Sequence, residues 1–266
     1  MDAQENNIQQ IKRTNQRGGR CLSATDLMEA GTISPEMGGL CWAMIEQGVP
    51  FLTGAVPGGA GKTTLMAALL AFLPPDETII TASDHATVER VTRNDPDTPV
   101  CLLAHEIGQG PWFAYIWGET AHLFFAAQGP MKRPVTCLHA DTPEQSAGIL
   151  RECGVSQQDI SAIGLQLYIR AMGSYDPVRR VTSMHCHLNG HMTPVYRWDQ
   201  GEDRFERLLD QQSIANGAAE GFDISPTRFL SNWRKYQDRL QEWKAAGTRD
   251  YRSVREEVLD TYISGS

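Results

Sequence analysis

The strongest constraint on the fold is a glycine-rich turn between an apolar strand pattern and an apolar helix pattern. The stretch FLTGAVPGGAGKTTLMAALLAFL occupies residues 51–73. A strand that turns through glycines into a helix N-terminus aims several backbone N–H groups at one point, where a phosphate can bind. The sequence therefore predicts a phosphate-binding loop, or P-loop, inside an α/β fold.

The predicted loop assigns a role to each of its residues. Lys62 would reach the β- and γ-phosphates and the Thr63 hydroxyl would bind Mg²⁺, so the expected ligands are ATP and Mg²⁺. Val56 stands where the usual pattern begins with glycine, and a β-branched residue resists unusual backbone angles. An ordinary glycine-rich turn is the alternative. The expected nucleotide-binding residues are Pro57, Gly58, Gly59, Ala60, Gly61, Lys62, Thr63 and Thr64.

Strand and helix patterns alternate on both sides of this loop. Alternation of this kind predicts a mainly parallel sheet covered by helices on both faces. Further along, consecutive strand patterns and the pair Asn189–Gly190 predict an antiparallel hairpin extension, followed by amphipathic C-terminal helices. Expected strands cover residues 49–54, 77–83, 99–104, 111–118, 133–140, 163–172, 178–188 and 192–199.

Three regions follow from these patterns. Residues 1–40 form an N-terminal tail and helical lead-in, in which we expect the polar residues 1–13 to be frayed. Residues 41–210 form the nucleotide-binding core, and residues 211–266 form a C-terminal helical region.

Composition narrows the possible partners and locations. The net charge of −8 argues against direct binding of nucleic acid, which proteins usually grip with a basic surface. No apolar run reaches the roughly 20 residues of a membrane span, and the N-terminus lacks the apolar region of a secretory signal. We therefore expect a cytoplasmic protein, and scattered cysteines that are reduced core residues.

Polar side chains at three further strand ends are candidates for catalysis. Glu119 follows the apolar run WFAYIWG and would reach the water shell of Mg²⁺. Asp84 and His139 also follow strand patterns, at the edge of an α/β sheet where ligands bind. The alternatives are a surface glutamate for Glu119, a helix N-cap for Asp84 and a structural role for His139.

The stretch MHCHLNGH brings together potential zinc ligands, but the hairpin pattern separates them. With a two-residue turn at Asn189–Gly190, His185 and His187 face one side of the strand. Cys186 and His191 face the other side. We favour the hairpin over a metal site, with the metal left open.

Four motifs in this order resemble the secretion ATPase superfamily, which serves type II and type IV secretion, type IV pili and the archaellum. They are VPGGAGKTT (Walker A), TASD (Asp box), YIWGE (Walker B) and CLHADTPEQSAGIL (His box). The similarity extends over residues 16–262. The resemblance implies a RecA-like core, a ring of identical subunits (six in that family), and partners in a secretion or pilus machine at the inner face of the membrane. It also implies an arginine supplied by the neighbouring subunit, for which Arg170, Arg179 and Arg180 are candidates.

Departures from the family pattern weaken hydrolysis more than binding. Ser83 replaces the glutamate of the Asp box and the Walker B segment is shortened, and we expect the large N-terminal domain of family members to be absent. Loss of a water-orienting carboxylate typically costs about 10²–10⁴-fold in rate. Two main functions stay open: a motor-type ATPase with slow turnover, or a nucleotide-gated binding module that regulates a partner. A small-molecule or nucleotide kinase is a third and weaker alternative.

Overall fold

The computed structural model describes residues 3–15, 18–175, 177–222 and 224–264. The helices are α1 (Ala3–Thr14), α2 (Ala24–Glu29), α3 (Pro35–Glu46), α4 (Lys62–Leu70), α5 (His85–Arg93), α6 (Glu119–Ala126), α7 (Pro143–Glu152), α8 (Gln157–Ser161), α9 (Gln211–Ala219), α10 (Pro226–Ala246) and α11 (Tyr251–Ile263). The strands are β1 (Phe51–Gly54), β2 (Thr78–Thr81), β3 (Val100–Leu103), β4 (Glu106–Ile107), β5 (Tyr115–Ile116), β6 (Lys132–Leu138), β7 (Leu165–Met172), β8 (Val178–Leu188), β9 (His191–Asp199) and β10 (Arg204–Arg207).

One mixed sheet forms the centre of the molecule, in the order β10-β9-β8-β7-β1-β6-β3-β2. The five strands from β7 to β2 run parallel, and β8, β9 and β10 extend the sheet as antiparallel neighbours. The short strands β4 and β5 follow β3 in the chain and lie outside this strand order. β4 pairs with β5, and its Ile107 pairs with Leu138 at the end of β6. The predicted α/β class, with its antiparallel extension and C-terminal helices, is confirmed.

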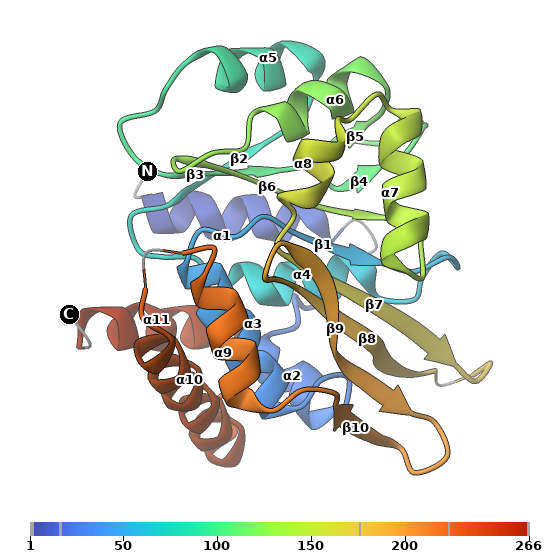
Figure 1. Ribbon diagram of the computed structural model, residues 1–266. Helices are drawn as coiled ribbons and strands as arrows, with labels where there is room; N and C mark the ends of the chain where they lie inside the picture. Colours follow the sequence, from blue (N-terminus) through green and yellow to red (C-terminus); the bar gives the residue numbers. More distant parts are fainter. Residues whose placement is uncertain (1–2, 16–17, 176, 223, 265–266) are drawn as a thin grey trace.

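Helices cover both faces of the sheet, as Figure 1 shows. Helices α5 to α8 lie on one side, and α1, α3, α4 and the C-terminal helices lie on the other. Helix α3 packs closely along α10, because Gly39 lets the backbone of Trp233 approach where a Cβ would lie only 2.8 Å from a carbonyl oxygen. Trp42 stacks between Phe72 and Tyr236, with ring centroids 5.1 Å and 4.1 Å apart. None of the helices described here is long and apolar enough to cross a bilayer.

Local signals in the sequence explain where these helices begin. Ser34 caps α3 by accepting a hydrogen bond from Met37 N, and Pro35 occupies the first turn, where its missing N–H leaves nothing unsatisfied. Asn189 and Gly190 adopt φ of 50° and 79°, which confirms the predicted type I′ turn. All six cysteines are free thiols; five are buried and Cys21 is half-buried.

The expectation of a frayed N-terminus is wrong for residues 3–13, and residues 1 and 2 lie outside the described residues. Residues Ala3–Thr14 form α1, whose Ile8 and Ile11 are buried against the core. The Asn7 side chain donates to Glu77 O and accepts from Ile79 N, both at 2.8 Å, and so satisfies the free edge of β2. These pairings stabilise a helix that its own polar sequence does not predict.

The expected strand at residues 111–118 is also largely wrong. Only Tyr115–Ile116 pair as a strand. Ala114 before them has φ of 57°, a left-handed conformation that interrupts an extended chain. Trp112 and Phe113 are exposed and form part of a loop.

Candidate active site

The predicted P-loop joins β1 to α4 at the carboxyl edge of the sheet. Gly59 and Gly61 adopt φ of 83° and 106°, where glycine is favoured, and α4 begins at Lys62 directly after them. The described non-glycine residues with positive φ are Ala114, Asn189 and Asp203, so Val56 is not among them. A valine is therefore accommodated at this position without backbone strain, and its side chain is half exposed.

Hydrogen bonds to the His box hold the first residue of the loop. Val56 N donates to Asp141 Oδ1 at 2.9 Å, and His139 Nδ1 donates to Val56 O at 2.8 Å. Since β1 and β6 are parallel neighbours, Gly54 pairs with Leu138 and the two strand ends lie together. The structure thus brings the predicted His139 to the predicted loop.

Lys62 meets a buried carboxylate that our sequence reasoning missed. Lys62 Nζ lies 3.5 Å from Glu106 Oε2 and 3.2 Å from His139 Nδ1. His139 Nε2 lies 2.8 Å from Glu106 Oε1. The Lys62 and Glu106 side chains are only 6% and 7% exposed, but both line a cavity beside the loop, so water screens their charges in part.

Glu106 reaches this position because β3 and β6 are parallel neighbours that end at the same edge. The sequence VCLLAHE carries the same signal as YIWGE, an apolar run followed by an acid. The adjoining His105 is buried, which lowers its pKa to about 4. Its carbonyl accepts a hydrogen bond from Cys137 Sγ at 2.6 Å.

The two predicted catalytic carboxylates lie elsewhere along the sheet edge. Asp84 caps α5 and accepts hydrogen bonds from Thr87 N and Ser83 Oγ, both at 2.8 Å. These hydrogen bonds lower the pKa of Asp84. Glu119 is the exposed first residue of α6. Among the described residues, no ion pair or hydrogen bond joins Asp84 or Glu119 to the P-loop, and their catalytic roles stay predictions.

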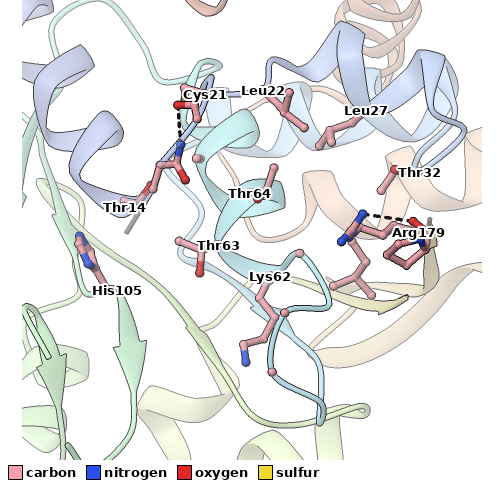
Figure 2. A pocket seen from close by; sticks show the side chains of 18 of the residues that line it. Thr14, Cys21, Leu22, Leu27, Thr32, Lys62, Thr63, Thr64, His105 and Arg179 are labelled. Atoms are coloured by element: carbon pink, nitrogen blue, oxygen red, sulfur yellow. Dashed lines mark hydrogen bonds between the residues drawn. The ribbon is translucent and has the colours of Figure 1, made fainter. Parts of the chain in front are cut away.

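A cavity of about 1060 Å³ opens beside the loop. Figure 2 shows Thr63 and Thr64 at the start of α4, with Cys21 and Leu22 beyond them. The wall thus changes from polar loop residues to partly apolar side chains of the N-terminal region, as suits a ligand with a phosphate end and a ring end. The lining residues come from the P-loop (Gly58, Gly59, Gly61, Lys62, Thr63 and Thr64), the N-terminal region (Thr14, Asn15, Gly18, Gly19, Arg20, Cys21, Leu22, Leu27, Ala30 and Thr32), α4 (Ala67), the β3–β5 segment (His105, Glu106, Trp112 and Tyr115), the His box (His139), and β7 and β8 with the segment between them (Ile169, Pro177, Val178, Arg179 and Arg180).

The three candidate arginines differ in their partners. Arg180 donates to both carboxylate oxygens of Asp203 at 2.8 Å and to Ala30 O at 2.9 Å. Arg170 lies 4.0 Å from Asp141. Arg179 lines the cavity and donates to Pro177 O at 3.2 Å.

The histidines of the β8–β9 hairpin lie as the register predicts. Leu188 pairs with His191 across the turn, and Cys186 is fully buried whereas His185 and His187 are half-buried. Burial lowers the pKa of His185. In the part of the chain that the structure describes, no three His, Cys, Asp or Glu side chains form a group that could hold a metal ion.

Comparisons with known proteins give distant similarities. No family model matches the sequence. The chain is 26% identical over 237 residues to the uncharacterized protein MJ1287 of Methanocaldococcus jannaschii, covering 78% of this chain and 86% of that protein. Among solved structures, the VirB11 ATPase of the Brucella suis type IV secretion system, in complex with sulphate, is 17% identical with a TM-score of 0.41. The Legionella pneumophila ATPase DotB is 15% identical with a TM-score of 0.39.

The matches to these two solved structures are partial. They cover 59% of this chain and 53% of the VirB11 chain, and 84% of this chain and 62% of the DotB chain. The chain therefore spans less than two thirds of the length of either ATPase.

Proposed function

We propose that the chain binds ATP with Mg²⁺ at residues 57–64 and hydrolyses its terminal phosphate. The observation that carries this proposal is the position of Lys62. It begins a helix after a loop with two left-handed glycines, lines a cavity of about 1060 Å³, and lies 3.5 Å from the buried carboxylate of Glu106. A lysine, a helix N-terminus and free loop N–H groups together favour a polyphosphate.

The residues present fit a magnesium ion beside the phosphates. Thr63 lines the cavity, and among the described residues the hydrogen-bond partner of its hydroxyl is the weak one, Cys137 Sγ at 3.7 Å. This hydroxyl would hold Mg²⁺, which supplies charge neutralisation at the β- and γ-phosphates when it is bound. Glu119 remains a predicted contributor through water.

Glu106 is the residue that we propose to accept the proton of the attacking water. The water oxygen forms a bond to the γ-phosphorus while the bond from that phosphorus to the β–γ bridging oxygen breaks, which leaves ADP and inorganic phosphate. Lys62 and the loop N–H groups stabilise the charge on the leaving oxygens. In this proposal, Glu106 does the work of the Asp-box glutamate, whose position is occupied by Ser83 in this chain.

A second candidate function is the nucleotide-gated binding module. The contacts of Lys62 with Glu106 and His139 favour it, because a phosphate must compete with a buried counter-charge before it reaches the lysine. In this case nucleotide binding would move the His box and the loop residue Val56 with it. Turnover would then be incidental to the switch.

Measurement of Lys62-dependent turnover separates the two functions. We expect the wild-type chain to release phosphate from MgATP and Lys62→Ala to lose both turnover and ATP binding. Lys244→Ala, an exposed lysine on α10, is the matched control. ATP binding without Lys62-dependent turnover would support the regulatory module and contradict hydrolysis. Equal ATP binding by the wild type and Lys62→Ala would contradict the proposed site itself.

We also propose that the subunit assembles into a ring, with six members as in the secretion ATPases that its motifs resemble. The resemblance supports a role in driving or regulating a secretion or pilus machine from the cytoplasmic face of the membrane. Sedimentation of the purified protein with and without a non-hydrolysable ATP analogue tests this assembly. A monomer under both conditions would contradict it.

A further inference from the structure

We propose that Arg179 binds the terminal phosphate within its own chain, so that the site needs no arginine from a neighbouring subunit. This inference rests on the proposed ATPase function. It leaves the proposed ring unchanged but departs from the expectation that a neighbouring subunit supplies the arginine.

The sheet places Arg179 beside the P-loop. Strand β7 runs parallel to β1, so both end at the carboxyl edge, and β8 returns from that edge with Arg179 opposite Ala171. A Cβ built on Gly61 would lie 3.2 Å from Arg179 Cδ and 3.6 Å from its Nε. The arginine side chain therefore passes close to Gly61, the residue that precedes Lys62.

A side chain at position 61 is disfavoured for two separate reasons. The φ of Gly61, 106°, is one that other residues rarely adopt. The absent side chain also leaves the space that Arg179 occupies. Since both requirements fall on the residue next to Lys62, the loop and the arginine form one unit in the folded chain.

The partners of Arg179 leave it available to an anion. The structure gives it one hydrogen bond, to Pro177 O at 3.2 Å, and among the described residues no carboxylate lies within 4.0 Å of its guanidinium. Arg180, by contrast, is fully engaged by Asp203 and Ala30. An arginine that lines this cavity and has no carboxylate partner among the described residues is suited to a phosphate oxygen.

The chemistry of the guanidinium fits the terminal phosphate. Its planar fork can bind two oxygens of one phosphate group, which a lysine ammonium cannot do. Charge on the γ-phosphate oxygens is stabilised in the transition state of hydrolysis, and an arginine there typically contributes about 10³–10⁵-fold in rate. In the proposed function, Lys62 stabilises the charge on the leaving oxygens. Arg179 would bind oxygens of the γ-phosphate, so the two cations would act on different oxygens.

The test compares Arg179→Ala with Arg197→Ala, a control that removes an exposed arginine from β9. We expect Arg179→Ala to lower kcat for MgATP by about 10³-fold, with Arg179→Lys recovering only part of the loss. Arg197→Ala should retain wild-type turnover. Wild-type turnover in Arg179→Ala would overturn the proposal.

Complementation decides whether the arginine acts within the chain. Lys62→Ala and Arg179→Ala chains are co-expressed with different tags and purified together. If Arg179 serves its own P-loop, no subunit in the mixture is complete and turnover stays at the level of the separate variants. Recovery of turnover would show that the arginine serves a neighbour and would overturn the inference.

A binding measurement keeps the inference testable if turnover is absent. The affinity for ATPγS relative to ADP should fall in Arg179→Ala and stay unchanged in Arg197→Ala. An unchanged ratio in Arg179→Ala would overturn the role of Arg179 alone. Failure of the wild-type chain to bind either nucleotide would instead overturn the proposed function and this inference with it.

Discussion

Replacement of Glu106 by glutamine removes the negative charge beside Lys62 with little change in side-chain shape. At the observed separation of 3.5 Å, two unit charges attract by about 5 kcal/mol at an effective dielectric of about 20 and by about 1 kcal/mol in bulk water. The cavity next to the pair admits water, so the lower part of this range applies.

We expect two opposite effects from Glu106→Gln. Without a competing carboxylate, Lys62 gains about 1–2 kcal/mol for a polyphosphate, so ATP binding in the absence of Mg²⁺ tightens by roughly 5–30-fold. Loss of the proton acceptor lowers turnover with MgATP by about 10²–10⁴-fold. Tighter binding with slower hydrolysis distinguishes this variant from a merely unfolded one.

The assay titrates a fluorescent ATP analogue in EDTA and measures phosphate release separately in Mg²⁺. Glu119→Gln is the informative comparison, because Glu119 is the acid that the sequence predicts for this role and is exposed. A thermal melt confirms that both variants fold. Weaker ATP binding by folded Glu106→Gln, or a loss of turnover in Glu119→Gln alone, would refute the assignment of Glu106.

Three further predictions concern the loop, the N-terminal helix and acid stability. Val56→Gly should change kcat/KM less than about twofold, since Val56 has no positive φ to relieve; a large gain in phosphate release would contradict this. Ile11→Ala should lower the free energy of unfolding in urea by about 2–5 kcal/mol, because Ile11 is 2% exposed; an unchanged midpoint would mean that α1 is not packed in solution. Burial lowers the pKa of His105 to about 4 from the ordinary 6.5, so His105 favours the folded state fully above pH 6.5 and loses this contribution as pH falls toward 4. Between pH 7 and pH 4, the free energy of unfolding should therefore fall more in the wild type than in His105→Gln, by up to about 3 kcal/mol. Equal falls in the two proteins, measured by denaturant titration, would refute the reasoning.

Sequence patterns predicted those parts of the fold that depend on local chemistry. The P-loop, the Asn189–Gly190 turn and the cap at Ser34 follow from glycine conformations and hydrogen bonds between residues that are close in the chain. The alternation of strand and helix patterns along the chain likewise predicted a mainly parallel sheet. These features need no knowledge of distant residues.

The features that the sequence did not predict depend on distant partners. Helix α1 is polar, and Asn7 is buried because it pairs with the edge of β2 about 70 residues later. Glu106 matters because β3 and β6 are neighbours, which brings it to Lys62 and His139. An apolar run precedes both Glu106 and Glu119 in the sequence, and the sheet order separates the two.

Helix α11 affects when the proposed nucleotide site is completed during synthesis. Tyr251 donates to Ala67 O and Arg255 donates to Ala71 O, both at 2.9 Å, at the far end of the helix that begins with Lys62. Each of these donors follows its acceptor by 184 positions. Until the ribosome has translated α11, these two carbonyl groups lack their side-chain donors, so the P-loop helix is synthesised early and gains these contacts much later.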